Sequence, residues 1–561
     1  MKLASGGLMV RMGLWGLLWV SCAAMARQNS NPTPQEGNGG EQPFKIAGTV
    51  VNAITGVPLP QARVSIQDTR NRAQMISMVT GENGHFEFTS LPAGKYALRG
   101  ARRGYISSGY EQHEQYSTAI VTGPEFATGN LMLRLTPMAM ILGHVLDESG
   151  EPLRSARVSL FLEDHGGGMS RVTRLNTATS DDRGYFDFNV LSPGTYFVSV
   201  SAKPWYAVHP STAQELGDSG QHVPVALDVA YLTTYYGGTT DAESAMAIEV
   251  KGGEHEQVDI RMSPVPALHL LFRTGVEEPG QRGGFTMPVL QKRVFDSVEF
   301  VQHDGMNIVS PGVYEITGVP AGRYNVTIKS STPGEAEQSS EMDLLHDGQD
   351  LNGTPGEPLG SLKVTVKMPG NEALPRQYAV ALQDSRQRTV AFRQGDAFGE
   401  ASFEDVTPGK YGIVFAAPGK LYSVARTSSS AGESVGHDVT VAPGAALEVT
   451  AVLSAGVVRM EGVVEKNGKP VAGVMVVLVP NDPAAHGELF RRDQSDFDGT
   501  FALQSVVPGM YTIVAVEDAW GFEWLKPGVL ARYVQHGQNV NVGELMRGTV
   551  RLPEAVEVQG R

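Results

Sequence analysis

Short stretches in which hydrophobic and polar residues alternate recur along the chain from residue 44 onward. Phe86-Glu87-Phe88 and Phe186-Asp187-Phe188 are examples, and each aromatic pair begins two positions after a glycine. Such alternation places every second side chain on one face of a β-strand. Almost no segment shows the spacing of an amphipathic helix. The pattern therefore predicts many short strands, each with one buried face.

A turn built from Pro and Gly and followed by Tyr ends five of these stretches and begins another strand. Pro fixes φ near roughly −65° and Gly accepts a positive φ, so the pair favours a tight hairpin turn. The copies are Pro92-Ala93-Gly94-Lys95-Tyr96, Pro193-Gly194-Thr195-Tyr196, Pro320-Ala321-Gly322-Arg323-Tyr324, Pro408-Gly409-Lys410-Tyr411 and Pro508-Gly509-Met510-Tyr511. Their spacing is that of whole domains and exceeds that of a solenoid repeat. We expect five tandem domains, each with a β-hairpin.

Three of these domains also open with a pair of strands joined by a Gly-x-Pro turn. The turns are Gly56-Val57-Pro58-Leu59, Gly150-Glu151-Pro152-Leu153 and Gly468-Lys469-Pro470-Val471. Short strands at regular spacing, separated by Gly and Pro, are typical of an antiparallel β-sandwich. The predicted fold is all-β, a tandem array of about five antiparallel β-sandwich domains.

The domain limits follow from the repeats. We predict β-sandwiches at 44–136, 137–264, 265–355, 356–455 and 456–550, followed by a C-terminal tail at 551–561. The last strand of one domain runs almost directly into the first strand of the next, and short joins favour a stiff or gently bent array. The second domain carries an aromatic insertion. The third and fourth are divergent, and the strand layout of 265–300 stays open.

The order of these turns and strands resembles a known family. In the first domain Gly56-Val57-Pro58-Leu59 precedes Ala62-Arg63-Val64-Ser65-Ile66, Gly84-His85-Phe86-Glu87-Phe88 and Leu91-Pro92-Ala93-Gly94-Lys95-Tyr96. This series resembles the carboxypeptidase regulatory-like domain, a transthyretin-like sandwich of the wider carbohydrate-binding-like fold group. Domains one, two and five follow it well, whereas three and four keep only its second half. The resemblance implies a domain that accompanies a peptidase without chemistry of its own, and it specifies a fold and no activity.

The N-terminal residues predict export. Lys2 and Arg11 precede an apolar run at 13–20, which is followed by small residues that end in Ala24-Met25-Ala26. This order is typical of a cleaved signal peptide at 1–26, and the run is too short to span a bilayer. Residues 27–43 read as a flexible spacer. An alternative treats Val20-Ser21-Cys22 as a partial lipobox with a lipid anchor at Cys22. We expect an exported bacterial protein, periplasmic or extracellular, with no transmembrane span; association with the outer membrane stays open.

The charge and cysteine content of the chain limit the classes of molecule that it is expected to bind. The 561 residues include 45 Lys and Arg against 60 Asp and Glu, a net charge of −15, and one cysteine. Because no basic run is present, neither nucleic acid nor anionic lipid is an expected partner. Removal of Cys22 with the signal peptide would leave no disulfide, thiol nucleophile or thiolate metal ligand. Envelope proteins or a polysaccharide are the expected partners.

No motif predicts an enzyme. The zinc-peptidase patterns His-x-x-Glu and His-Glu-x-x-His do not occur, the 13 histidines are scattered, and no Gly-rich phosphate loop is present. We therefore expect no catalytic residue, no cofactor and no metal site. Two acidic turns, Asp181-Asp182-Arg183-Gly184 and Asp496-Phe497-Asp498-Gly499, fit hairpin turns better than calcium loops.

Two short motifs raise a serine esterase as an alternative. Gly432-Glu433-Ser434-Val435-Gly436 fits a nucleophile elbow, and His165-Gly166-Gly167-Gly168 fits an oxyanion-hole run. A reactive serine needs a strand-turn-helix that presents its hydroxyl to a histidine. Ser434 instead follows three serines in what reads as a flexible loop, and the His-Gly run lies in another domain. We disfavour this alternative.

Aromatic residues outside the hairpins are the candidate ligand or interface residues. They are Trp205, Tyr206, Tyr231, Tyr235, Tyr236, Trp520 and Trp524. The favoured interpretation packs them against neighbouring domains, and the alternatives are a protein interface or stacking on sugar rings. Sugar binding requires two or more exposed, coplanar rings, whereas a scaffold buries them at domain boundaries. The predicted function is a non-catalytic exported scaffold or protein-interaction rod, with carbohydrate binding as the alternative.

Overall fold

The computed structural model describes residues 43–561 with short gaps. Left out are residues 72, 211–224, 274–287, 302, 329–337, 353–356, 369–371, 386, 419, 430–431, 485 and 527. The predicted signal peptide, nearly all of the spacer and the lipid-anchor alternative at Cys22 therefore lie outside the described residues. Within the described part strands dominate, and its single α-helix, α2 (Ala531–Val534), is four residues long. None of its helices has the length and apolar character needed to cross a membrane.

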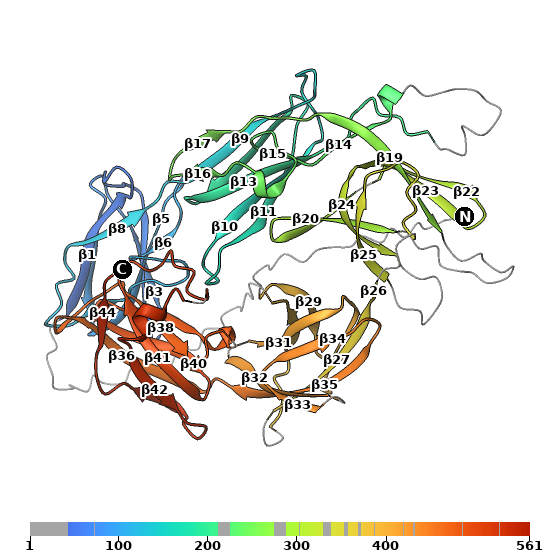
Figure 1. Cartoon of the computed structure of the whole chain (residues 1–561). Coiled ribbons are helices and arrows are strands. Elements are labelled where there is room, and N and C mark those ends of the chain that lie inside the picture. The colour runs from blue at the N-terminus through green and yellow to red at the C-terminus, as the bar shows by residue number, and fades with distance from the viewer. Residues whose placement is uncertain are drawn as a thin grey trace, which may run out of the picture. The chain divides into compact units, whose positions relative to one another are not determined.

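The first sandwich encloses the core of the first predicted domain (Figure 1). Its strands are β1 (Phe44–Asn52), β2 (Arg63–Asp68), β3 (Met75–Val79), β4 (His85–Leu91), β5 (Gly94–Ala101), β6 (Ser108–Gly109), β7 (Ile120–Thr122) and β8 (Leu131–Leu135). One sheet has the order β4-β1-β8 and the other β3-β2-β5-β6, with β7 also paired to β5. Strand β8 runs parallel to β1, and a Cβ on Gly48 would lie 2.0 Å from the carbonyl oxygen of Leu131. Only glycine fits at this crossing.

The second sandwich repeats this arrangement with a longer connection. Its strands are β9 (Ala139–Leu146), β10 (Arg157–Asp164), β11 (Arg171–Thr179), β12 (Tyr185–Leu191), β13 (Gly194–Ser201), β15 (Thr234–Tyr235), β16 (Ile248–Val250), β17 (His255–Gln257) and β18 (Ile260–Arg261). The sheets are β11-β10-β13-β15, with β16 on β13, and β12-β9-β17, with β18 on β9. Alternating burial along β12 places Phe186 and Phe188 in the core, as the sequence pattern predicts.

The third sandwich takes one strand from the insertion of the second domain. Its strands are β14 (Val229–Tyr231), β19 (Pro264–Arg273), β20 (Val289–Val294), β21 (Ser297–Phe300), β22 (Gly305–Ser310), β23 (Val313–Pro320), β24 (Gly322–Ile328), β25 (Gln338–Leu344) and β26 (Glu357–Pro358). Strand β14 pairs antiparallel with β19 at the edge of the sheet β14-β19-β23-β22. The predicted boundary at residue 264 therefore cuts through one sheet, because strand pairing connects residues on both sides of it.

The fourth sandwich is formed by one continuous set of strands. They are β27 (Gly360–Lys367), β28 (Ala379–Gln383), β29 (Thr389–Gln394), β30 (Glu400–Val406), β31 (Gly409–Ala417), β32 (Lys420–Ser429), β33 (Gly432–Val435), β34 (Asp438–Val441) and β35 (Ala446–Ala455). The order is β29-β28-β31-β32-β35-β27-β30, with β33 on β32 and β34 on β31. Because β32 pairs with both β31 and β35, it joins the two layers around the core.

The fifth sandwich includes the segment that the sequence predicted as a tail. Its strands are β36 (Val458–Lys466), β37 (Lys469–Pro470), β38 (Met475–Pro480), β39 (Arg491–Gln494), β40 (Thr500–Val506), β41 (Gly509–Val516), β42 (Gln538–Val542), β43 (Gly548–Arg551) and β44 (Val556–Gln559). Strand β44 pairs parallel with β36 and β41 and buries Val556 and Val558. The prediction of a tail at 551–561 is wrong, because these alternating valines complete the core.

The recurring tyrosine has the same role in all five sandwiches. Each ring is buried, and each hydroxyl donates a hydrogen bond to the backbone carbonyl four residues earlier. The pairs are Tyr96 with Pro92 at 3.1 Å, Tyr196 with Ser192 at 2.7 Å, Tyr324 with Pro320 at 2.6 Å, Tyr411 with Thr407 at 2.6 Å and Tyr511 with Val507 at 2.8 Å. The tyrosine thus fastens the corner between the hairpin strands.

The glycine of the turn is needed for space and not for a positive φ. The left-handed residues lie before the proline, as with Ser90 at φ 58° and Ser505 at φ 54°, and the glycines after it have ordinary φ values. The expectation that this glycine carries a positive φ is therefore wrong. A Cβ at Gly509 would lie 3.2 Å from the ring of Tyr511, so a side chain there would crowd the folded-back tyrosine.

The first and fifth sandwiches contact each other through polar groups. The ammonium of Lys95 lies 2.6 Å from a carboxylate oxygen of Asp496 and 3.1 Å from one of Asp498. The short joins predicted contacts between sandwiches adjacent in the chain, and this contact between residues some 400 positions apart was not indicated by the sequence.

Candidate functional site

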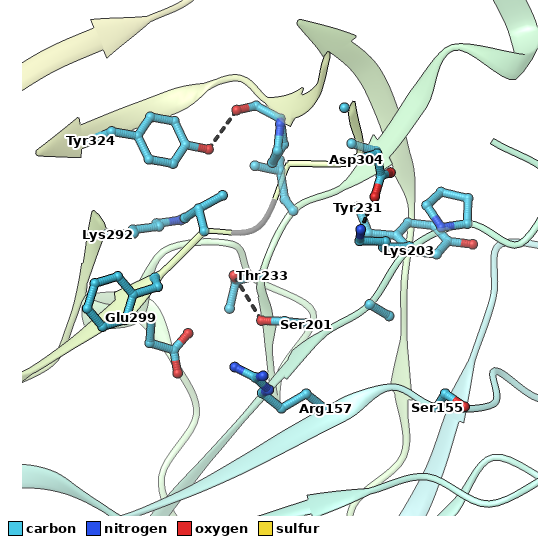
Figure 2. Close-up of a pocket in the computed structure, with 18 of the residues that line it drawn as sticks. Ser155, Arg157, Ser201, Lys203, Tyr231, Thr233, Lys292, Glu299, Asp304 and Tyr324 are labelled. Atoms are coloured by element: carbon cyan, nitrogen blue, oxygen red, sulfur yellow. Dashed lines mark hydrogen bonds and ion pairs between the residues drawn. The ribbon is translucent and has the colours of Figure 1, made fainter. Parts of the chain in front are cut away.

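A pocket of about 370 Å³ opens where strands of the second and third sandwiches meet (Figure 2). The second sandwich contributes Arg157 on β10 and Ser201 on β13, and the third contributes Lys292 on β20 and Tyr324 on β24. The insertion adds Tyr231 on β14. The site therefore depends on the packing of two sandwiches and on no continuous stretch of sequence.

Strand register brings the polar lining residues together. Arg157 pairs with Ser201 across β10 and β13, and Lys292 pairs with Glu299 across β20 and β21. Residues directly opposite each other on neighbouring strands place their side chains on the same face of a sheet. Both pairs accordingly point into the same space, as Figure 2 shows.

The pocket carries more positive than negative charge. Its two acidic residues are already engaged, because Asp304 pairs with Lys203 and Glu299 lies 2.7 Å from the guanidinium of Arg174. Three further cations line it, namely Arg154, Arg157 and Lys292. No ion pair within 4 Å joins these three to an acidic group in the part of the chain that the structure describes.

Lys292 is the cation most affected by its surroundings. Burial lowers the pKa of its ammonium, and the nearby carboxylates of Glu299 and Asp241 oppose that change. A charged amine that has lost part of its water gains free energy from a bound anion, which restores some of the lost solvation. Lys292 is therefore well suited to contact an acidic group.

Hydroxyl groups and ring faces complete the lining. The hydroxyls of Ser201 and Thr233 lie 3.3 Å apart, and Tyr324 donates its hydroxyl to the Pro320 carbonyl at 2.6 Å. Burial raises the pKa of Tyr324. The hydroxyl of Tyr231 donates to Glu148 at 2.6 Å. Burial is the main cause that raises the pKa of Tyr231, and the hydrogen bond to the Glu148 carboxylate raises it further. The two tyrosines therefore stay protonated and line the pocket with uncharged rings. Ser201 and Thr233 supply the hydroxyl groups that can hydrogen-bond to a ligand.

A buried chain of acidic and imidazole groups stands beside the pocket. The rings of His209 and His269 each lie between two carboxylates: Asp304 and Asp228 are 3.0 and 2.7 Å from His209, and Asp228 and Glu315 are 3.0 and 3.5 Å from His269. His209 and Asp228 belong to the insertion, whereas the other three belong to the third sandwich. These contacts attach the insertion to the third sandwich and fix Asp304 at the edge of the pocket.

The sequence did not single out any of these cations. Arg154, Arg157, Lys203 and Lys292 occur in unremarkable strand and turn contexts, and only the meeting of the two sandwiches gathers them. The aromatic insertion is the one predicted feature that reaches the pocket, because Tyr231 lines it.

Of the predicted aromatic residues, Trp205 is the one that is fully open to solvent. It is 85% exposed and stands at 87° to the neighbouring ring of Tyr206, whose hydroxyl donates to Glu148. The exposed pair is therefore perpendicular and does not form the coplanar platform that sugar stacking requires. Burial and the hydrogen bond with Glu148 raise the pKa of Tyr206 to about 12.

The tyrosines of the insertion lie inside or between the sandwiches. Tyr235 is 0% exposed and packs with Phe161, Val294 and Phe295, which come from the second and third sandwiches. Tyr236 is half-buried against the core of the second sandwich. Tyr235 therefore lies at a packed contact between two sandwiches, whereas Tyr236 packs within the second.

The tryptophans of the fifth sandwich also lie at domain contacts. Trp520 stacks on His113 of the first sandwich, with ring centres 4.9 Å apart and planes at 3°. Trp524 packs on Phe490, and the guanidinium of Arg492 lies 4.5 Å from its ring centre. A Cβ on Gly168 of the second sandwich would lie 2.6 Å from the Trp524 ring, so that glycine is needed for close approach.

The acidic residues of the turns at 181–184 and 496–499 accept backbone hydrogen bonds or form ion pairs. Asp181 accepts hydrogen bonds from the backbone N–H groups of Arg183 and Tyr185 at 2.9 and 2.8 Å. The carboxylates of Asp496 and Asp498 both form ion pairs with the ammonium of Lys95 of the first sandwich.

The esterase alternative does not match the local fold. Ser434 lies within strand β33, where it pairs with Thr427 of β32. The expectation that it lies in a flexible loop is wrong, and no helix follows it as a nucleophile elbow requires. The backbone at Ser434 therefore gives no support for serine chemistry.

Comparison with known proteins identifies the first two sandwiches. Residues 45–120 and 140–263 match the model of the carboxypeptidase regulatory-like domain. These two segments of the chain are similar to that domain. The fifth sandwich, whose turns follow the same pattern, lies outside the matched residues, as do the divergent third and fourth. No match was found among curated proteins.

Several solved structures resemble parts of the chain. The Bacillus anthracis TIE protein is 12% identical with a TM-score of 0.18, and the alignment covers 75% of this chain and 76% of that one. GBS52, the minor pilin of Streptococcus agalactiae, is 11% identical with a TM-score of 0.20, covering 42% and 100%. BcpA, the major pilin subunit of Bacillus cereus, is 10% identical with a TM-score of 0.14, covering 73% and 99%. Scores of this size support neither a common arrangement nor a common function.

Proposed function

We propose that this protein is a non-catalytic, exported scaffold of the bacterial envelope that binds an acidic saccharide in the pocket between its second and third sandwiches. The observation that carries the proposal is a set of three cations, Arg154, Arg157 and Lys292, that line a concave site of about 370 Å³ and form no ion pair within 4 Å among the described residues. The predicted signal peptide supports export, and the carboxypeptidase regulatory-like domains support a role without chemistry.

The lining suits a sugar that bears a carboxylate. A guanidinium such as that of Arg157 binds a carboxylate through paired hydrogen bonds, and Lys292 adds a second, partly desolvated charge. Ser201 and Thr233 supply hydroxyl groups for the hydroxyls of the ring. Ligand sites commonly combine apolar walls with a few such convergent polar groups, and Tyr231 and Phe300 form walls here.

The overall charge limits the class of ligand. A net charge of −15 repels long polyanions at a distance, so the attraction must be local and short-ranged. A saccharide unit with one or two carboxylates fits that condition, whereas a nucleic acid needs an extended basic surface. We therefore expect binding that depends on the acidic group and weakens with salt.

The test compares an acidic and a neutral polymer. The chain from residue 27 is titrated with oligogalacturonate and, separately, with dextran of matched size, and binding is measured by calorimetry. We expect saturable binding of the acidic polymer alone. The double variant Arg157→Ala/Lys292→Ala should bind at least about tenfold more weakly, equivalent to about 1.4 kcal/mol.

A matched variant controls for the loss of surface charge. Arg183→Ala removes an arginine of the same sandwich whose side chain is 80% exposed and which does not line the pocket. This variant should bind as the unaltered chain does. Equal binding of dextran, or an unchanged affinity in the double variant, would contradict the proposal. Tighter binding of an acidic peptide than of the saccharide would also contradict the proposal and would indicate a protein partner.

A further inference from the structure

Two histidines and one glutamate meet where the fourth and fifth sandwiches adjoin. His437 directly precedes β34 of the fourth sandwich, whereas His486 and Glu488 lie at the short 3-10 helix η4 (Gly487–Leu489) of the fifth. One ligand atom from each of the three lies within 4.8 Å of the others. The sequence predicted no metal site because these residues follow no local spacing motif.

Neighbouring groups fix the backbone at His486 and Glu488 and leave space for the ring of His437. A Cβ on Gly412 would lie 2.7 Å from Cδ2 of His437, so this glycine gives the imidazole its space. The buried guanidinium of Arg491 donates to the backbone carbonyl of Glu488 at 2.7 Å. The N–H of His486 donates to the carbonyl of Asp482 at 3.1 Å. The cluster is thus supported by the backbone of both sandwiches.

The distances within the cluster are close without being hydrogen bonds. Nδ1 of His437 lies 3.8 Å, and Nδ1 of His486 lies 3.6 Å, from Oε1 of Glu488. Both exceed the length of a normal hydrogen bond. In a tetrahedral zinc site with bonds of about 2.1 Å, adjacent ligand atoms are roughly 3.4 Å apart. Small side-chain rotations would therefore bring these atoms to coordination distance.

The surroundings match those of a metal site. A carboxylate oxygen of Asp438 lies 3.7 Å from Nε2 of His437, on the side of the ring where a carboxylate commonly orients a metal-bound imidazole, and would need to move closer to form that hydrogen bond. Ser423 donates its hydroxyl to Glu488 Oε1 at 3.3 Å. The three side chains are 17%, 34% and 22% exposed, so an ion can reach them from solvent and retain a water as its fourth ligand.

We propose that His437, His486 and Glu488 bind a divalent transition-metal ion, with Zn²⁺ preferred, and that this ion links the fourth sandwich to the fifth. Two neutral imidazoles and one carboxylate form a donor set that suits zinc and not calcium or magnesium, which take oxygen ligands. The inference is independent of the pocket and of its saccharide, because no residue is shared between the two sites.

The test measures zinc binding by a tag-free chain from residue 27 that has been treated with a chelator. Calorimetry with Zn²⁺ should show one ion bound per chain. His437→Ala, His486→Ala and Glu488→Gln should each remove or weaken this binding at least about tenfold, since each deletes one of three ligands. His536→Ala alters an exposed histidine of the fifth sandwich outside the cluster and should leave binding unchanged.

A second measurement distinguishes this site from adventitious histidine binding. Co²⁺ in the unaltered chain should give the visible absorption of a tetrahedral site, and that signal should be absent in His437→Ala/His486→Ala. Zinc should also raise the thermal unfolding midpoint of the unaltered chain and not that of the double variant, because a ligand that binds only the folded state stabilises it.

The outcomes decide the proposal. Circular dichroism of the metal-free variants should match that of the metal-free chain, which shows that they fold. Zinc binding of equal stoichiometry and affinity in the double variant would overturn the proposal, as would the absence of zinc binding by the unaltered chain. Hydrogen exchange should also slow in both the 436–438 and 486–489 segments on zinc addition, and slowing in only one of them would contradict a link between the sandwiches.

Discussion

The first and fifth sandwiches meet in a contact that is filled and charge-matched, whereas the second and third meet around a pocket with unmatched cations. In the first case Arg492 forms two hydrogen bonds to the carboxylate of Glu114, at 3.2 and 2.6 Å, and also donates to the carbonyl of Gly166 at 2.9 Å. In the second case Arg157 and Lys292 face about 370 Å³ of open space. The two contacts are built from the same kind of sandwich.

The difference shows what makes a contact between similar domains either join the two domains or leave a pocket for a ligand. Buried charges that find partners hold two surfaces in one register, and removing one partner is costly because the other stays buried. Cations that line a hollow without a close ion pair can still attract an anion from solvent. Charge matching and packing, and not the sandwich fold, separate the two cases.

The largest effect is expected when the matched contact is broken. Arg492→Ala removes a side chain that is 3% exposed and leaves Glu114 and the Gly166 carbonyl without it. We expect the fifth sandwich to lose about 3 to 5 kcal/mol of stability, measured by native-state hydrogen exchange of its core strands. Adding Glu114→Gln should restore part of that loss, because the carboxylate is no longer left unpaired. A loss below about 1 kcal/mol would show that this contact is not structural.

A smaller effect concerns pH at Asp493, the residue that follows Arg492 in strand β39. Burial raises the pKa of Asp493 from 3.8 to about 6, although its carboxylate accepts a hydrogen bond from the Ala502 N–H at 2.7 Å. The folded chain then binds this proton more tightly than the unfolded chain, so the free energy of unfolding falls as pH rises from about 4 to about 6. The fall amounts to about 2 to 3 kcal/mol.

Asp493→Asn tests this assignment. The amide cannot ionise, and its oxygen can still accept from Ala502, so the variant should lose this part of the pH dependence and be more stable at pH 7. Denaturation at pH 4, 6 and 7 measures both. An unchanged slope between pH 4 and 6 in the variant would assign the pH dependence to another group.

The smallest effect is expected at the contact between the second and third sandwiches. The hydroxyl of Tyr235 is fully buried and has no hydrogen-bond partner among the described residues, and burial raises its pKa. Tyr235→Phe should therefore stabilise the chain by about 1 kcal/mol, since an unsatisfied polar group is removed and the ring is kept. Thermal unfolding measures it, with Tyr324→Phe as a contrasting variant that loses a 2.6 Å hydrogen bond. Destabilisation by Tyr235→Phe would show that this hydroxyl has a partner.

Much of the fold was predictable because its signals are local. Phe86 and Phe88, or Phe186 and Phe188, alternate along single strands and are buried as the pattern requires. The recurring tyrosine lies four residues from its carbonyl partner in all five sandwiches. Errors arose where the signal was not local: β14 was assigned by position to the second domain, and β44 was taken for a tail because it stands apart from the repeats.

The candidate sites were not predictable in the same way. The aromatic residues stood out in the sequence, which left open packing between domains, a protein interface and sugar stacking; in the structure Tyr235, Trp520 and Trp524 contact residues of neighbouring sandwiches. The pocket joins Arg157 on β10 to Lys292 on β20, two strands that lie more than a hundred positions apart in the chain. His437 and His486 likewise carry no motif, because they meet only when two sandwiches pack together.

The sequence by itself determined the strands, the hairpin corners and the family of the first two sandwiches, since each of these depends on residues within a few positions of one another. Tertiary structure alone decided which charges are matched, where a hollow remains and which histidines come together. The physical reason is range: alternation and turns act along the backbone, whereas burial, ion pairing and metal coordination depend on distances between side chains that the chain brings close only after folding.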